Sequence, residues 1–259
     1  MRLVFLGTGT SYGVPQIGCD CRTCKSTDPR DRRTRTAALI ESGGRRLLID
    51  TPPELRLQLV TACVGSVDAV LFTHAHADHV HGIDDLRAIS ARQRAPLDVY
   101  GAASTLAELE RRFSYIFDGT PPLPGTSKPE LLAHRLEPDV EMEIAGFRVR
   151  ALALPHGERT VLGYRVGPVA YLTDAKAVPA EAIARLAGLE VLVLNALLPR
   201  PHPLHLSVPE AVAAAQQIGA RRTFLTHLTH DAPHAELAAR LPAGIAPAYD
   251  GLVIDLGAV

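Results

Sequence analysis

Short apolar runs alternate with amphipathic stretches along most of the chain. The apolar runs have the length and content of buried strands and cover Leu3–Leu6, Thr36–Glu41, Arg46–Asp50, Ala69–Phe72, Leu97–Tyr100, Phe147–Leu154, Leu162–Val166, Val169–Leu172, Val191–Leu194, Thr223–Thr226 and Leu252–Leu256. Helical patterns between them predict helices over Pro53–Ala62, Ile83–Gln93, Ser104–Phe117, Pro179–Leu186, Val208–Ile218 and His234–Leu241. Strands that alternate with helices indicate sheets covered by helices. Because many connections are too short for parallel crossovers, part of each sheet must be antiparallel. The pattern predicts an α/β sandwich of two mixed sheets rather than a Rossmann or barrel fold.

Two local signals mark a helix start and a long loop. Ser207 precedes the helix expected from Val208, and Glu210 follows three residues later, which is the signature of a capping box. Residues 118–129 contain four prolines and two glycines. This segment cannot be regular structure, so we expect either a lid beside a site or a plain surface loop.

Composition limits the class of protein. The chain has 259 residues, of which 47% are hydrophobic and 21% charged, and its formal net charge is −1. We interpret residues 1–259 as one globular domain. The near-neutral charge argues against a protein that coats long nucleic acid. The densest basic stretch holds Arg30, Arg32, Arg33 and Arg35; it is interpreted as a solvated loop face, with a local nucleic-acid patch as the alternative. No secretory leader and no apolar run of bilayer length are visible, so we expect a cytoplasmic protein without a membrane partner.

The strongest chemical signal is the segment THAHADH at residues 73–79, directly after the apolar run that ends at Phe72. His74 and His76 are two residues apart, so both imidazoles project to one side of an extended chain. Asp78 and His79 follow where the chain must turn. Imidazole and carboxylate together suit zinc, iron or manganese, so this cluster predicts a metal site.

Three later residues have the same placement after apolar runs. They are His156, Asp174 and His227. Loops at strand ends are where functional sites are commonly built. Taken singly, each residue has a structural explanation as good as the functional one, but with the cluster they can supply the ligands for two metal ions.

This constellation resembles the metallo-β-lactamase superfamily over nearly the whole chain. The resemblance implies a four-layer αββα sandwich with the metal site at one edge. It implies that one metal is held by His74, His76 and His156, that the other is held by Asp78, His79 and His227, and that Asp174 bridges them. Asp50 resembles the early aspartate of the superfamily, which, together with Thr73, would orient the ligands from behind. Relatives of this type are commonly homodimers, and we expect a homodimer here.

A second cluster, Cys19, Cys21 and Cys24, offers three thiolates, one short of a closed tetrahedral site, and His230 can be the fourth ligand. The set resembles the structural zinc site of the cyclic phosphodiesterases of the carbon–phosphorus lyase pathway. The segments GTGTSYGVP at residues 7–15 and DHVHG at 78–82 resemble the same family. The alternative is a group of reduced free thiols. Cys63 is interpreted as a small buried apolar residue.

The glycine-containing segment at residues 7–13 also invites comparison with a dinucleotide fingerprint. Its spacing is GxGxxxG and no helix obviously follows. We therefore expect a loop that approaches the metal edge.

His205 precedes the capped helix and resembles the histidine that family members place near the leaving group. We expect it to act as general acid. The alternative is that it only donates a hydrogen bond to the substrate or orients a metal ligand through a hydrogen bond. His202 is the weaker candidate. Relatives often carry an aspartate where this chain has Asn195, which leaves the fine substrate assignment open.

Charge counting favours a small or cyclic phosphodiester as substrate. Two divalent ions (zinc or manganese, or else iron), the carboxylates of Asp78 and Asp174, and a metal-bridging hydroxide leave a charge of about +1, which suits a diester monoanion. Asp78 thus belongs to the catalytic centre as well as to the ligand set. The alternatives are a nuclease acting on RNA or DNA ends, a thioesterase or lactonase on the same fold, and a metal-dependent binding protein without catalysis.

Overall fold

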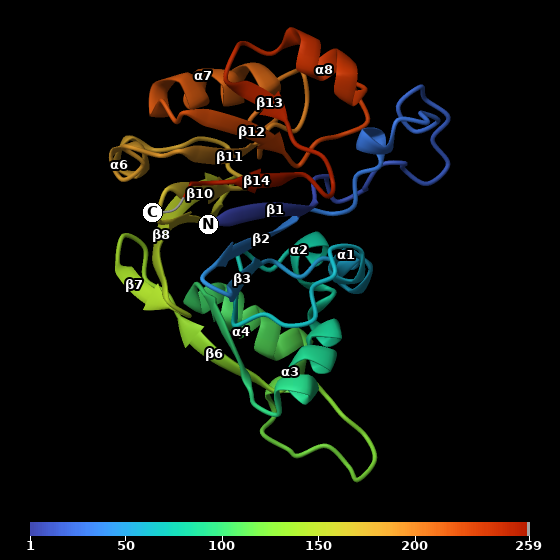
Figure 1. The fold of residues 1–259 in the computed structure, drawn as a ribbon, viewed down its shortest axis with the longest axis vertical. Helices are drawn as coiled ribbons and strands as arrows, with labels where there is room; N and C mark the ends of the chain where they lie inside the picture. Colours follow the sequence, from blue (N-terminus) through green and yellow to red (C-terminus); the bar gives the residue numbers. More distant parts are fainter. Residues whose placement is uncertain (258–259) are drawn as a thin grey trace.

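Two mixed β-sheets form the centre of the molecule (Figure 1). The computed structural model describes residues 1–257, and in that part each sheet has seven strands. The first sheet has the order β14 (Val253–Asp255), β1 (Arg2–Gly7), β2 (Ala37–Ser42), β3 (Arg45–Ile49), β4 (Ala69–Leu71), β5 (Leu97–Gly101), β6 (Leu131–Arg135). The second has the order β13 (Ile245–Pro247), β12 (Arg222–Thr226), β11 (Val191–Asn195), β10 (Val169–Leu172), β9 (Arg159–Val166), β8 (Phe147–His156), β7 (Glu141–Ile144). In each sheet the run of parallel strands is joined to antiparallel neighbours.

Helices cover the outer face of each sheet. The first sheet carries α1 (Leu55–Thr61), α2 (Ala77–Val80), α3 (Arg87–Gln93), α4 (Ala103–Arg112) and α5 (Ser114–Phe117). The second carries α6 (Ala180–Ala184), α7 (Val208–Ile218) and α8 (His234–Arg240). Two short 3-10 helices, Pro29–Asp31 and Ile83–Leu86, complete the regular structure of the described residues. The layers are therefore α, β, β and α, as the resemblance implied.

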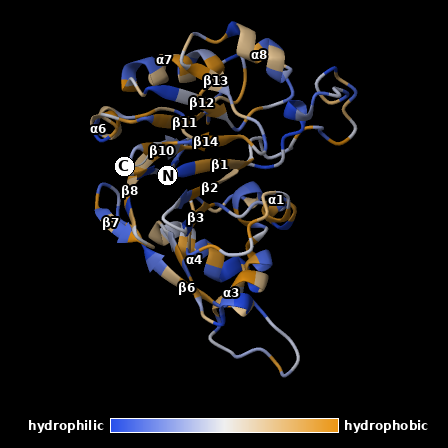
Figure 2. Ribbon diagram, viewed as in Figure 1, coloured by the Kyte–Doolittle hydropathy of each residue, from blue (hydrophilic) through white to orange (hydrophobic). Residues whose placement is uncertain are grey.

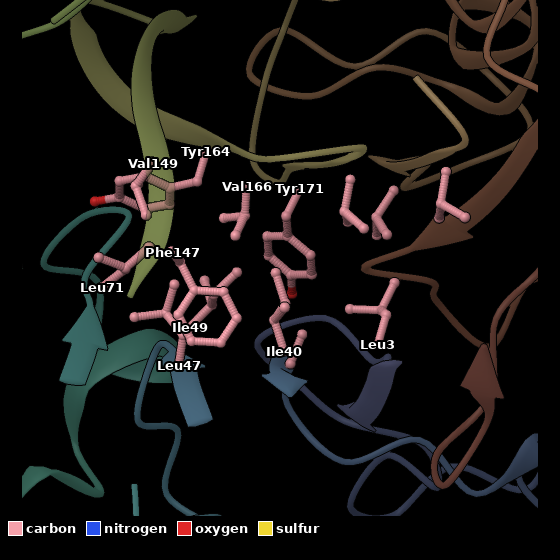
Figure 3. Packing of buried hydrophobic residues seen from close by; sticks show 14 of the residues in the cluster. Leu3, Ile40, Leu47, Ile49, Leu71, Phe147, Val149, Tyr164, Val166 and Tyr171 are labelled. Carbon is pink, nitrogen blue, oxygen red and sulfur yellow. The ribbon is translucent and has the colours of Figure 1, made fainter. Parts of the chain in front are cut away.

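The core between the sheets (Figure 3) explains why successive side chains of a strand point to opposite faces of its sheet. Leu47 and Ile49 of β3 face the second sheet, whereas Leu48 between them packs under the helices of the first. This two-residue period places every second side chain in the central core. From the other sheet, Tyr164 enters the same core fully buried, and its hydroxyl donates to the carbonyl of Phe72 at 2.6 Å. Apolar side chains from both sheets thus fix the end of β4, and the segment with the predicted metal-ligating residues 73–79 follows directly after it.

The predicted elements are found with small shifts at their ends. The helix from Val208 to Ile218 and its capping box between Ser207 and Glu210 are confirmed. The predicted helix over residues 104–117 is divided at Phe113 into α4 and α5. Residues 118–129 contain neither helix nor strand, as expected. Three strands were not predicted, β6, β7 and β13, because they are short or largely exposed and lack an apolar run.

Cys63 is exposed, so its interpretation as a buried apolar residue is wrong. The residue follows the end of α1 and has a φ of 55°. In this left-handed position after a helix the chain leaves the helix axis, and the side chain has no core to enter.

Among residues 1–257 no helix combines the length and the apolar character that crossing a bilayer requires.

Candidate metal centre

The structure brings the predicted metal-ligating side chains together at one edge of the sandwich, where loops follow strands. His74 and His76 follow β4, His156 ends β8, Asp174 follows β10 and His227 follows β12. Ligand atoms of His74, His76, His156 and Asp174 lie within 4.8 Å of one another, and so do those of Asp78, His79 and His227. The members of each implied ligand set thus lie close together, with Asp174 beside the first set, and Asp174, His205 and His227 form a further group of this kind.

Asp174 lies between the two sets. Its Oδ1 is 3.4 Å from Nε2 of both His79 and His227, and its Oδ2 is 3.7 Å from Nε2 of His74. These distances are longer than hydrogen bonds. They are close to the separation of about 3.4 Å between two N or O ligands of one tetrahedral ion whose metal–ligand bonds are about 2.1 Å. The carboxylate is therefore spaced as a bridge between two cations.

Unpartnered nitrogens supply an independent test of fit. Nε2 of His74, His79 and His227 is buried and has no hydrogen-bond partner within the described part of the chain. Buried polar atoms are normally paired, since leaving one unpaired costs about 1–3 kcal/mol. Three such atoms that converge on the same carboxylates fit a pair of divalent metal ions, which accept neutral imidazole.

A hydrogen-bonded chain behind the ligands starts at Asp50. His79 Nδ1 donates to Asp50 Oδ2 at 2.7 Å, and the Thr73 hydroxyl donates to the same oxygen at 2.8 Å. The hydroxyl of Thr73 in turn accepts from His74 Nδ1 at 3.0 Å. On the other side His156 Nδ1 donates to the carbonyl of Leu204 at 3.0 Å. Each contact fixes one ring nitrogen as the donor and leaves Nε2 free to ligate.

The backbone is strained at three residues of this centre. Asp50, Asp174 and His227 have φ values of 63°, 58° and 57°, in the left-handed region that residues other than glycine rarely adopt. All three directly follow, or nearly follow, a strand end. Such conformations cost on the order of 1–3 kcal/mol each and persist where the surroundings enforce them, commonly at functional sites. The turns aim these side chains across the end of the sheet.

Carboxylates and imidazoles shift one another's pKa values. Burial alone would raise the pKa of Asp174, but the neighbouring His227 and His79 lower it well below its usual range. Burial alone would lower the pKa of His79, but Asp174, Asp50 and Asp78 raise it well above its usual range. Burial and His79 lower the pKa of His74. Asp174 is therefore ionised in a buried position, with imidazoles around it.

His205 lies against the same centre. Its Nδ1 is buried without a hydrogen-bond partner among the described residues and is 3.9 Å from Asp174 Oδ2. Its ring stacks on that of His227 with centroids 5.1 Å apart. His202 is less buried, and its ring centroid is 5.2 Å from that of His205. Asn195 is fully buried and bonds both the amide and the carbonyl of Ala175, so it fixes the loop after Asp174 and faces no open space.

The four residues of the second predicted set also converge. Nδ1 of His230 is 3.2, 3.6 and 3.4 Å from Sγ of Cys19, Cys21 and Cys24, respectively. Sulfur and nitrogen ligands of one tetrahedral zinc ion lie about 3.5 Å apart. The amide of Cys24 donates to Cys21 Sγ and lowers the pKa of that thiol to about 6, which favours the thiolate that binds metals. The arrangement fits one tetrahedral ion.

Arg33 is not part of a solvated loop face. Its side chain is only 1% exposed, whereas Arg30 and Arg32 of the same stretch are exposed as expected. The guanidinium donates to the carbonyls of Thr229 and Ala232 and pairs with Asp31 at 3.2 Å. It therefore fastens the segment that carries both His227 and His230. No pattern in the chain signals this role, since the acceptors are backbone carbonyls almost 200 positions away.

The glycine-containing segment lies beside the centre, as expected. Gly9 forms β-bridges to both Arg35 and Leu228, and the amide of Leu228 donates to the carbonyl of Thr8 at 2.8 Å. A Cβ on Gly9 would lie 2.6 Å from the carbonyl oxygen of Arg33, so the close approach requires glycine. No helix follows the segment directly, which agrees with the rejection of a dinucleotide site.

Replacing Asp50 by asparagine is expected to weaken metal binding at the centre by about 10- to 100-fold. The carboxylate accepts from the amide of Thr73 through one oxygen and from His79 and the Thr73 hydroxyl through the other, whereas asparagine has one acceptor oxygen and must turn its NH2 group towards one of these donors. A titration against a competing chelator measures the change. Asp68→Asn is the matched control, because Asp68 bonds Arg45 and the amide of Arg46 away from the centre. Unchanged affinity in the Asp50 variant would contradict the orienting role.

Comparison with known proteins identifies the family of this chain. Residues 45–228 match the β-lactamase superfamily domain. The crystal structure of a diphosphatase from the PhnP family superposes with a TM-score of 0.90 at 39% identity, over 98% of this chain and 97% of that one. The chain therefore belongs to the β-lactamase superfamily and, within it, to the PhnP family.

Two curated relatives share only part of their length with this chain. An octanoyltransferase of Porphyromonas gingivalis is 43% identical over 98% of this chain and 52% of its own length. A ribonuclease Z of Bradyrhizobium is 26% identical over 63% of this chain and 48% of its own length. The chain thus spans about half the length of each.

Proposed function

We propose that this chain is a phosphodiesterase that hydrolyses a small or cyclic phosphodiester with two divalent metal ions, zinc or manganese. His74, His76 and His156 would hold one ion, Asp78, His79 and His227 the other, and Asp174 both. The observation that carries the proposal is the position of Asp174, whose two oxygens face the two sets of imidazoles at 3.4–3.7 Å. Cys19, Cys21, Cys24 and His230 would hold a structural zinc ion.

Charge and space favour a small anionic substrate. The two ions, when bound, supply Lewis-acid stabilisation of phosphoryl oxygens and a nucleophile at neutral pH. The two carboxylates of the centre, Asp78 and Asp174, offset half of their charge and leave the positive excess that an anion needs. A cleft of about 510 Å³ opens beside His76 and His156 and is lined further by Ser104, Thr105 and Arg159. Its size suits a small molecule.

His205 is proposed as the proton donor to the leaving group. Burial and the neighbouring His227 lower its pKa to about 3, so the imidazole is neutral in the free protein at pH 7. An anionic substrate beside the ring raises that pKa, and the proton is then held where the leaving alkoxide needs it. The side chain of Leu204 packs close to Gly157, and the Leu204 carbonyl bonds His156, so the loop that carries His205 is fixed to the centre.

Two other reactions have specific support. The relative named as an octanoyltransferase favours an acyl ester or thioester as substrate, although only half of that protein matches. The relative named as ribonuclease Z favours an RNA substrate. The similar PhnP-family structure is that of a diphosphatase, which favours cleavage at phosphorus. Because that structure matches almost the whole chain, we rank hydrolysis at phosphorus first.

A substrate panel on one preparation distinguishes these reactions. Bis(p-nitrophenyl) phosphate, a cyclic nucleotide, an octanoyl thioester and a short single-stranded RNA are compared by kcat/KM with zinc-loaded and manganese-loaded protein. We expect the small diesters to exceed the thioester and the RNA by at least about tenfold. Faster cleavage of the thioester or of the RNA would replace the proposal with the corresponding alternative.

His205→Ala is expected to lower kcat by about 10²–10⁴-fold on a diester with an alkyl leaving group, and much less on one with a p-nitrophenolate, which leaves without a proton. His134→Ala is the control, because His134 pairs with Asp98 on the first sheet away from the centre. Equal losses on both diesters would show that His205 only positions the substrate.

A further inference from the structure

A second polar cavity lies on the outer face of the second sheet. It measures about 320 Å³ and is lined by Glu141, Arg148, Arg150, Arg165, Gly167, Ala184 and Arg185. The strand β7 beside it carries hydrophilic colours in Figure 2, and Figure 1 shows α6 and β7 on the same side of the molecule. Arg148 and His156 are eight residues apart on β8, about 26 Å in an extended strand, so the cavity is remote from the metal centre.

The strand pattern explains why arginines gather there. Leu152 and Leu154 of β8 pack with the residues of α6 in the outer core. Arg148 and Arg150 have the same parity and lie on the same face, beyond the end of this short helix. Arg150 is directly opposite Arg165 of β9, so their side chains also share that face. A surface that α6 would otherwise cover is left open and basic.

Two of the arginines, Arg150 and Arg165, are held in place by contacts with the protein. Arg150 donates to the carbonyl of Asp139 and pairs with Glu141 at 3.2 Å. Arg165 donates to the carbonyls of Gly167 and Arg185. These contacts hold the two guanidinium groups next to each other, although like charges directly opposite in a sheet are destabilising.

The other two arginines keep most of their donors free. The side chain of Arg148 has no hydrogen-bond or ion-pair partner among residues 1–257, and the side chain of Arg185 has only the carboxylate of Asp139 at 3.7 Å. Both side chains are exposed. They come from different elements, β8 and the end of α6, so that two guanidinium groups with free N–H donors border one cavity.

The charge around the cavity is not balanced. Its lining has four arginines and one glutamate. With Asp139, which pairs with Arg185, and Glu143, which lies opposite Arg148 in the strand pair, a formal excess of one positive charge remains in a chain whose net charge is −1. Burial and the neighbouring Arg150 lower the pKa of Arg165, the direction expected where positive charge lacks a counter-ion. A bound anion would supply that counter-ion and accept hydrogen bonds from the free guanidinium N–H groups of Arg148 and Arg185.

We propose that this cavity is a second anion-binding site, separate from the metal centre, for a small molecule that carries two phosphate groups or a diphosphate. A planar guanidinium can donate two parallel hydrogen bonds to two oxygens of one phosphate group. Arg148 and Arg185 can each bind one phosphate group in this way. The cavity volume suits a ligand of nucleotide size. The near-neutral chain charge favours a small ligand over extended nucleic acid.

Isothermal titration of metal-loaded protein with inorganic pyrophosphate and with ADP tests the site. The wild-type protein is compared with Arg148→Ala/Arg185→Ala and with Arg56→Ala/Arg92→Ala, a control that removes the same charge from exposed arginines on α1 and α3. We expect a binding event whose dissociation constant rises at least about tenfold in the first double variant and stays unchanged in the control. Turnover of bis(p-nitrophenyl) phosphate serves as the check that the metal centre is intact, and it should be the same in all three.

Three results would overturn the proposal. They are identical isotherms in all three proteins, equal weakening in both double variants, and tighter binding of a single-stranded oligonucleotide than of ADP at the arginine cavity. Arg148→Glu provides a second variant at an exposed position, and its thermal midpoint checks the fold, because the new carboxylate lies opposite Glu143 of β7. It should weaken pyrophosphate binding further than Arg148→Ala does, and an unchanged dissociation constant would also count against the site.

Discussion

Asp174→Asn is expected to lower kcat/KM for a small phosphodiester by roughly 10³-fold or more. Asparagine has the size of aspartate and tolerates the left-handed φ of 58° at this position, so the substitution removes the charge and leaves the backbone as it is. Without the carboxylate the two sets of imidazoles lose the group that lies between them. The loss of several kcal/mol of transition-state stabilisation by the metals corresponds to this factor.

Metal content and a matched variant make this expectation specific. Mass spectrometry of the purified Asp174→Asn protein should find at most one ion in the histidine centre, where we expect two in the wild type. Asp98→Asn is the control, since Asp98 pairs with the half-buried ring of His134 at 2.7 Å, away from the centre in the first sheet. Wild-type metal content and rate in the Asp174 variant would contradict a bridging role.

Cys24→Ser is expected to remove one zinc ion per chain and to lower the thermal midpoint by about 10 °C. The sulfur of Cys24 is nearly buried, 3.4 Å from Nδ1 of His230, and the cluster joins the loop before β2 to the segment that follows His227. Serine is a poor ligand for zinc, so the tie between these two distant segments is lost.

The fourth cysteine supplies the control for this substitution. Cys63 is exposed and lies outside the cluster, so Cys63→Ser should keep the zinc content and the thermal midpoint of the wild type. Equal zinc content in the Cys24 and wild-type proteins would show that the thiols are free.

The sequence predicted those residues of the centre that lie close together in one short segment or directly after an apolar run. The cluster at residues 73–79 has its chemistry in consecutive positions, and His156, Asp174 and His227 each follow a strong strand signal. The resemblance divided them into two sets, and the structure brings the members of each set within 4.8 Å of one another.

Features that depend on backbone atoms or on distant partners could not be predicted. Arg33 looks like one more residue of a basic loop, and only the fold brings the carbonyls of Thr229 and Ala232 to it. The carbonyl of Leu204, which orients His156, leaves no mark in a sequence. β7 was missed because three of its four residues face solvent and show no apolar alternation. The arginines of the remote cavity are spread over β8, β9 and the end of α6, so no local run reveals them.

The central claim is that a dinuclear centre built from His74, His76, Asp78, His79, His156, Asp174 and His227 hydrolyses phosphodiesters. Stepwise addition of zinc or manganese to metal-free protein, with turnover of bis(p-nitrophenyl) phosphate followed at each step, tests it most directly, and His76→Ala is the inactive reference. We predict that the rate rises until two ions occupy the histidine centre and that the His76 variant stays at background. A folded protein that holds both ions and still does not cleave the diester would contradict the account.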